Sequence, residues 1–314
     1  MNGIVNVLKP PGMSSHDVVD FVRRAFDIKK AGHTGTLDPA AAGVLVVCLG
    51  TATRLARFLL LEDKEYRFEI TFGLSTSSGD AFGEIVGEGD ASKIVEEKVR
   101  SVLPCFTGEI LQVPPMESAL KYRGQKLYQL ARKGIVVERQ TRTAHIKSLE
   151  FVWGTGWGSR HPRALLHLSC SKGTYVRSLC DDIGERLGCG AYMSFLVRTK
   201  VGSFDISDSV TLEEIRSAAG SGRLAEKVVK MEDALPEFPA VRIKAGAVAS
   251  AVSGAKIYPP GVESLNGNIH SGDIVRLIGP EGLLALARAE VDEEKKGGMA
   301  FKPVCVLAQQ GGQR

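Results

Sequence analysis

Alternating apolar positions predict strands in this chain. From residue 66 to residue 72 every second residue is tyrosine, phenylalanine or isoleucine, and Gly73 follows, which is typical of a half-buried strand that ends in a turn. The apolar run 164–169, which stops shortly before Lys172-Gly173, has the same character. Both segments are therefore predicted to be strands.

Apolar residues in two other segments recur at the spacing of an α-helix. In the first, Ser14 or Ser15 can cap a helix that begins at His16, because Ser-x-x-Asp approximates a capping box. The second runs from residue 174 to residue 188, where Gly188 is of a type that often ends helices. Since strands and helices are both indicated, the predicted fold class is α+β.

The character of the chain changes near residues 236–239. The tail that follows is rich in glycine and has short β-like runs at 274–278 and 283–289, separated by Gly-containing turns. We therefore place a domain boundary near residue 237, between a large domain 1–237 and a small domain 238–314.

Composition and length exclude several classes of protein. With 314 residues, 44% of them hydrophobic and 24% charged, the chain can bury a large core. No apolar run approaches the roughly 18 residues of a membrane span, and the first residues show no secretory leader pattern. We expect a cytoplasmic protein with no membrane association.

The cysteines give no sign of a metal or disulfide site. All six are scattered without a CxxC pair, and no HExxH motif accompanies them. Small buried thiols in a reducing compartment are the simplest interpretation. No metal site is predicted.

Basic residues are concentrated in one segment, although the net charge of +4 is modest. Residues 121–147 hold eight Lys or Arg against the single acid Glu138, with Tyr122 and Tyr128 interleaved. This pattern is typical of a surface that follows nucleic-acid phosphates. A solvated helix face with snorkelling lysines is an equally good interpretation of the composition alone.

The segment 32–39 combines two glycines, two threonines and an acid just before a proline. Pro39 disfavours helical backbone at Asp38, so the carboxylate can be presented at the tip of a shaped loop. An Asp in this context can equally be a turn residue that bonds its own backbone. The Gly-Lys-Ser/Thr of a phosphate-binding P-loop is absent from this segment.

Five ordered blocks resemble the bacterial tRNA pseudouridine-55 synthases, which convert the uridine of the T loop. They lie at residues 3–19, 32–54, 64–73, 108–134 and 170–199. The resemblance implies a catalytic domain with a mixed, largely antiparallel sheet and an RNA-binding insertion at about 108–146. The tail resembles a PUA domain, a small β-barrel-like RNA-binding module, though more loosely.

The resemblance also implies roles for particular residues of this sequence. Asp38 falls on the family's nucleophile, and Arg177 on the arginine that pairs with it. Tyr66 falls on the tyrosine that stacks against the flipped base. A scaffold protein would not need these three residues together.

Further positions match supporting parts of the family's site. Tyr175 and Leu196 fall on pocket residues, and His33 on the histidine that fills the gap left by the flipped nucleotide. Lys9 and Pro10 match a motif that supports the active-site loop, more structural than catalytic.

Around the loop the chain departs from the family pattern at several positions. Ala40, Ala42 and Val46 stand where leucine, threonine and proline are usual, and Val197 replaces one arginine. None of these changes removes a reacting group, so they bear on loop packing and RNA contact rather than on the reaction.

The reaction implied by the resemblance needs no cofactor, because it breaks a carbon–nitrogen bond and forms a carbon–carbon bond without redox change. A carboxylate can add to C6 of the base, trap C1′ of the sugar or remove the 2′ proton, and the sequence does not choose among these routes. All three require Asp38 to be ionised, which a guanidinium such as that of Arg177 favours.

The partner implied is the T-arm of tRNA, bound by a monomer with no obligatory protein partner. Two alternatives stay open. One is a non-catalytic RNA-binding or tRNA-folding protein, and the other is a pseudouridine synthase that acts on another RNA.

Overall fold

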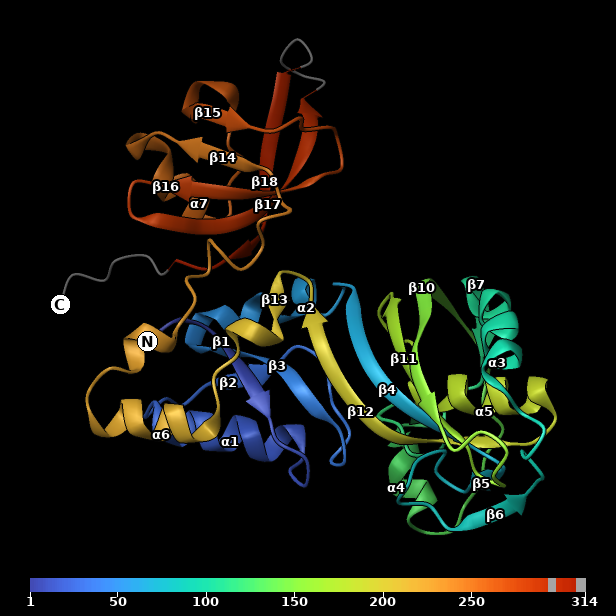
Figure 1. Ribbon diagram of the computed structural model, residues 1–314. Coiled ribbons are helices and arrows are strands. Elements are labelled where there is room, and N and C mark those ends of the chain that lie inside the picture. The colour runs from blue at the N-terminus through green and yellow to red at the C-terminus, as the bar shows by residue number, and fades with distance from the viewer. Residues whose placement is uncertain (293–297, 309–314) are drawn as a thin grey trace.

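The computed structural model describes residues 1–292 and 298–308, which form two large β-sheets (Figure 1). Within these residues the larger sheet has nine strands in the order β1-β3-β12-β4-β11-β10-β7, with β2 paired to β3 and β13 to β12. Its strands are β1 (Gly3–Lys9), β2 (Ala31–His33), β3 (Ala42–Leu49), β4 (Lys64–Phe72), β7 (Gly108–Gln112), β10 (Arg142–Thr155), β11 (Arg163–Cys170), β12 (Ala191–Val201) and β13 (Phe204–Asp205). All neighbours are antiparallel except β3 and β12, so the expected mixed, largely antiparallel sheet is confirmed.

The parallel contact between β3 and β12 is short and very close. It consists of the pairs Ala42 with Val197 and Gly43 with Arg198. At Gly43 φ is +111°, and a Cβ there would lie 2.1 Å from the carbonyl oxygen of Arg198, so this approach requires glycine. The contact places the loop before β3 directly beside β12.

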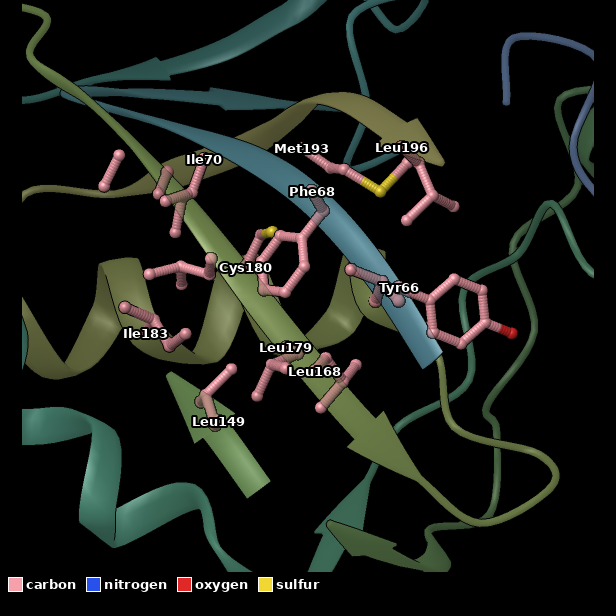
Figure 2. Close-up of a cluster of buried hydrophobic side chains, with 14 of the residues drawn as sticks. Tyr66, Phe68, Ile70, Leu149, Leu168, Leu179, Cys180, Ile183, Met193 and Leu196 are labelled. Carbon is pink, nitrogen blue, oxygen red and sulfur yellow. The ribbon is translucent and has the colours of Figure 1, made fainter. Parts of the chain in front are cut away.

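Helix α5 (Val176–Leu187) packs against the middle of this sheet. The predicted alternation in β4 is confirmed, because Phe68 and Ile70 are buried against Leu179 and Ile183 of the helix (Figure 2). The helix predicted for 174–188 is confirmed as well, and Gly188 ends it in the left-handed conformation with φ of 74°. This core fixes both β4 and the start of α5.

Helices α1 (Ser15–Ala25) and α6 (Leu212–Gly220) pack together with β1 and β3 at the other end of the sheet (Figure 1). Ser14 caps α1 and forms a full capping box with Asp17, as the sequence predicts, although the helix begins one residue before His16.

Shorter elements complete this part of the chain. They are α2 (Ala56–Leu59), α3 (Glu96–Val102), and the paired strands β5 (Leu74–Thr76) and β6 (Ile85–Glu88). Turns of 3-10 helix cover Gly50–Arg54, Leu103–Phe106, Ile206–Asp208 and Leu224–Lys227, and two more lie in the part with the smaller sheet, at Ala245–Ala247 and Pro259–Gly261.

The segment between β7 and β10 carries most of the basic cluster. It contains a small hairpin, β8 (Lys121–Tyr122) and β9 (Gln125–Lys126), followed by α4 (Leu127–Ala131). The alternative of one solvated helix face is wrong, because α4 is only five residues long. Seven of the eight basic side chains are exposed, although Lys147 pairs with Asp63.

The smaller sheet has the order β15-β14-β16-β17-β18. Within the described residues its two end strands, β15 and β18, do not pair with each other. Its elements are β14 (Ala240–Ile243), α7 (Val248–Ser253), β15 (Val262–Asn266), β16 (Ile274–Gly279), β17 (Gly282–Asp292) and β18 (Gly298–Val306). The two β-like runs predicted in the tail lie in β16 and β17 and are confirmed.

The two sheets are joined by a shared apolar cluster and by arginines. Leu55 and Leu59 belong to the same buried cluster as Leu286 of β17. Arg54 donates to the carbonyl of Val306 over 2.7 Å, which satisfies an edge carbonyl of β18. The smaller sheet is therefore docked on the larger part by packing as well as by the chain connection.

Within the described residues, no helix has both the length and the apolar character needed to cross a membrane.

Candidate active site

Asp38 lies in the loop between β2 and β3, and a serine from α1 holds this loop by its backbone. The Ser15 hydroxyl donates to the carbonyl of Leu37 over 3.0 Å and accepts from the Leu37 N–H over 2.8 Å. The N–H and the carbonyl of Leu37, the residue before Asp38, are therefore both hydrogen-bonded by one side chain of α1.

Lys9 holds the same loop from the other side. Its ammonium is fully buried at the end of β1 and donates to the carbonyls of Ala41 (2.6 Å), Pro10 (2.9 Å) and Pro39 (3.2 Å). Burial lowers the pKa of Lys9 to about 8, although the negative charge of Asp38 opposes this. Lys9 therefore lies against the backbone of the loop that carries Asp38.

Arg177 and Asp38 form a two-point ion pair. Arg177 Nε lies 3.1 Å from Asp38 Oδ2, and its Nη2 donates to Oδ1 over 3.4 Å. Arg177 is 5% exposed and donates also to the carbonyls of Ser78 (3.2 Å) and Glu117 (2.9 Å), which hold the guanidinium in one orientation. The pairing expected from the sequence is thus present in the structure.

A second buried acid, Asp80, lies beside this pair. Its Oδ2 is 3.9 Å from Arg177 Nη1, while its Oδ1 accepts from the Ser78 hydroxyl (2.5 Å) and from the N–H of Phe82 (3.0 Å). Arg177 is therefore shared between two carboxylates. Asp80 is not among the site residues expected from the sequence.

The environment raises the pKa of Asp38 above its usual value. Burial is the largest cause and the charge of Asp80 adds to it, while Arg177, Lys9 and Arg198 act in the opposite direction. The carboxylate is nevertheless accessible, because 32% of the side chain is exposed. The site thus combines a reachable acid with surrounding cations that favour its ionised form.

Tyr66 and Leu196 lie on neighbouring strands of the apolar cluster at the edge of this site. Tyr66 of β4 is 8% exposed, and Figure 2 shows its hydroxyl pointing away from the cluster. Leu196 of β12 belongs to the same cluster and is 7% exposed. Arg198, two residues further along β12, is the direct cross-strand partner of Tyr66.

Tyr175 stands just before α5, as its N-cap residue. Its backbone is held at both polar groups by Gln112 of β7, over 3.0 Å and 3.1 Å. Burial raises the pKa of the Tyr175 phenol. Only Val176 separates it from Arg177, so it flanks the ion pair.

His33 ends β2, on the other side of the Asp38 loop. Its Nδ1 accepts from the N–H of Gly35 over 3.3 Å. Burial lowers the pKa of His33, and the positive charge of Arg198 adds to this, so the neutral imidazole is favoured.

The structure thus brings Asp38, Arg177 and Lys9 into one site, with the aromatic and apolar candidates beside them. Among the described residues, no three His, Cys, Asp or Glu side chains are grouped so as to hold a metal ion. Asp80 and Arg198 are the functional candidates that sequence reasoning missed. Their only local signals were the Ser-Ser-Gly-Asp order of 77–80 and a basic residue in an apolar strand.

Family models match almost the whole chain. Residues 23–176 match the TruB family pseudouridylate synthase N-terminal domain, and residues 177–235 match the tRNA pseudouridylate synthase B C-terminal domain. Residues 239–300 match the PUA domain.

Curated relatives and solved structures agree with these matches. The tRNA pseudouridine synthase B of Pelotomaculum thermopropionicum is 64% identical over 312 residues, 99% of each chain. That of Symbiobacterium thermophilum is 50% identical over 254 residues, 81% of this chain and 82% of the relative. A chain of a Cbf5-Nop10-Gar1 complex superposes with a TM-score of 0.75 and 32% identity, covering 98% of this chain and 85% of that one.

Proposed function

The chain belongs to the TruB family of pseudouridylate synthases, which are isomerases, and we propose that it converts the uridine at position 55 of the tRNA T loop to pseudouridine. The 64% identity to a tRNA pseudouridine synthase B over 99% of both chains supports tRNA as the substrate. The PUA domain and the exposed basic segment supply surfaces for RNA outside the site.

The observation that carries the proposal is the two-point pair between Asp38 and Arg177. A carboxylate that is 32% exposed, held by a buried arginine and carried on a loop clamped by Lys9 and Ser15, suits a reactive group better than a structural turn.

In the proposed reaction the N1–C1′ bond of uridine breaks, the base turns over, and a C5–C1′ bond forms. C5 gives up its proton and N1 gains one, so atoms and electrons balance without any oxidant or added group. Attack on C6, attack on C1′ and removal of the 2′ proton all use an ionised carboxylate at Asp38. Arg177 favours that ionised form, and its fixed guanidinium holds the carboxylate oxygens in place.

The base reaches Asp38 only after it leaves the tRNA stack. Unstacking costs a few kcal/mol, and an aromatic surface returns roughly 1–3 kcal/mol per base. We assign this surface to Tyr66, with Leu196 and Tyr175 excluding water from the reacting groups. His33, whose neutral form is favoured, is assigned to the gap in the T loop, where a flat ring can replace the missing stack.

We further propose that the protein acts in the cytoplasm as a monomer, with the domain boundary near residue 237. The start of the second sheet at Ala240 and the family matches that end at 235 and begin at 239 support this boundary. The likeness to chains of two complexes that contain Cbf5, at 31% and 32% identity, favours as second candidate a synthase for another RNA. The higher identity to tRNA enzymes favours the first.

The test is to incubate the purified chain with an unmodified tRNA transcript and to map pseudouridine by carbodiimide labelling and primer extension. Modification at position 55 alone is expected. A transcript with cytidine at that position and the Asp38→Asn variant serve as controls. Modification of a ribosomal RNA fragment with the tRNA left unmodified would support the second candidate, and no modification of either would refute catalysis.

A further inference from the structure

Arg198 of β12 is a buried cation that no role assigned so far explains. We propose that it is a positioning residue, which holds both ends of the Asp38 loop and the hydroxyl of Tyr66 in one fixed arrangement. The inference rests on the proposed function, since it concerns the alignment of the acid with the aromatic surface for the base.

The side chain of Arg198 closes the Asp38 loop at its two ends. It is 2% exposed, its Nε donates to the carbonyl of Val44 over 2.8 Å, and its Nη2 donates to the carbonyl of Gly35 over 3.0 Å. Gly35 precedes Asp38 by three residues, and Val44 lies at the start of β3. One guanidinium therefore fixes the span across which Asp38 is presented.

The same side chain reaches Tyr66. The two residues are paired across β12 and β4, and the Arg198 guanidinium is close enough to the Tyr66 phenol to act against the rise of its pKa. Arg198 therefore joins the Asp38 loop, through two hydrogen bonds, to the strand that carries the aromatic ring.

The backbone of Arg198 leaves it little freedom to move. It is packed against Gly43 so closely that any Cβ on Gly43 would clash with it, at 2.1 Å. A planar, branched donor group anchored at such a point can hold three acceptors in fixed directions, which a lysine ammonium on a flexible stem does not reproduce.

The charge of Arg198 also acts on its neighbours. It lowers the pKa of Asp38 and of Tyr66, and it lowers the pKa of Lys9 and His33, because it favours negative and disfavours positive groups nearby. Arg177, Asp80 and Lys9 are the other charged groups that face Asp38. The effect of the hydrogen bonds of Arg198 and the effect of its charge on Asp38 can therefore be separated by substitution.

Two variants make that separation. Arg198→Lys keeps the charge and loses the branched donor, while Arg198→Gln keeps a planar donor and loses the charge. Arg67→Gln is the matched control, because Arg67 is an exposed arginine on the adjacent strand, opposite Val197. Single-turnover rate against pH, tRNA affinity and melting temperature are measured for each, with saturating tRNA in the rate assay.

In the profile of rate against pH, we expect Arg198→Lys to lower the plateau about tenfold or more, because alignment is lost. The fall in rate on the acidic side should stay at the wild-type pH, because the charge remains. Arg198→Gln should lower the plateau and also move the acidic limb to higher pH. Affinity for tRNA should stay within about threefold in both, since no phosphate contact is removed. In Tyr66→Phe, a further Arg198→Lys change should cost less than it does in the wild type, because the hydroxyl that Arg198 is proposed to hold is already gone.

Wild-type rates per folded molecule in Arg198→Lys would overturn the positioning role, as would full additivity with Tyr66→Phe. A test without turnover keeps the inference separate from the proposed function. The titration of the Asp38 carboxyl carbon, followed by NMR, should move to higher pH in Arg198→Gln and not in Arg67→Gln. If the wild type forms no pseudouridine, the proposed function fails, and an unmoved titration then refutes the inference as well.

Discussion

Replacing Arg177 by methionine should raise the pKa of Asp38 further and shift the acidic limb of the pH–rate profile to higher pH. Methionine keeps the length and apolar character of the stem and removes the cation 3.1 Å from the carboxylate. Burial and Asp80, which both raise the pKa of Asp38, are then opposed only by Lys9 and Arg198. Since the ionised carboxylate is the reactive form, a higher pKa means that activity is lost at a higher pH as the solution is acidified.

The size of the effect follows from the geometry of the pair. A neighbouring guanidinium typically lowers the pKa of a carboxyl by ~1 to 3 units, each corresponding to ~1.4 kcal/mol. With two contacts and a nearly buried arginine, we expect the acidic limb to move by about one to three pH units. Below the limb the rate should fall about ten- to thousand-fold, and raising the pH should recover the part of the loss that is due to protonation.

The assay is single-turnover release of tritium from uridine labelled at C5, with tRNA saturating at every pH. Arg186→Met is the matched control, because Arg186 is an exposed arginine in the last turn of the same helix. Melting temperature is followed in parallel, since the carbonyls of Ser78 and Glu117 lose a donor and an unpaired buried group costs roughly 1–3 kcal/mol. A limb that stays at the wild-type pH while the plateau drops would refute the electrostatic reasoning and leave Arg177 only an orienting role.

Four further outcomes are expected. Asp38→Asn should abolish turnover while tRNA affinity, measured by filter binding, falls less than about tenfold, because no phosphate contact changes; measurable turnover would exclude Asp38 as the reactive group. The pKa of Lys9 is lowered to about 8, so the wild-type rate should decline as the pH rises through that value. The unfolded chain keeps this proton up to about pH 10.5, so between about pH 8 and 10.5 it binds more protons than the folded chain, and this group should raise rather than lower the melting temperature over that range. A rate that stays flat would contradict the loop-holding role. Removal of residues 238–314 should raise KM more than it lowers kcat, and an equal fall in both would argue against a remote binding module. Affinity for tRNA should fall steeply with salt, and a flat response would exclude the basic segment 121–147 as the RNA track.

The elements that carry a local signal were predicted well from the sequence. The capping box at Ser14, the alternation in β4 and the glycine at the end of α5 each depend on a few neighbouring residues, and the structure shows all three. The pair of Asp38 and Arg177 was expected from family resemblance alone, because 139 positions separate the two residues and no local rule joins them.

What was missed depends on contacts that no local pattern shows. Arg198 looked like an ordinary basic residue in a strand, and only the parallel pairing of β12 with β3 reveals that it is buried beside the Asp38 loop. Asp80 likewise becomes a candidate only when the loop after β5 folds back against α5. The basic segment was ambiguous for a different reason, since composition does not distinguish a helix face from a hairpin.

The clamps on the Asp38 loop bind carbonyl oxygens, at Gly35, Leu37, Pro39 and Ala41, rather than side chains. Every amino acid supplies a carbonyl, so the identity of the exposed or half-exposed loop residues is only weakly constrained as long as the backbone path is kept. Alanine at position 40, where the resemblance implies leucine, is compatible with this arrangement. The path of this loop therefore depends less on its own half-exposed side chains than on distant residues such as Lys9 and Arg198 that bind its backbone.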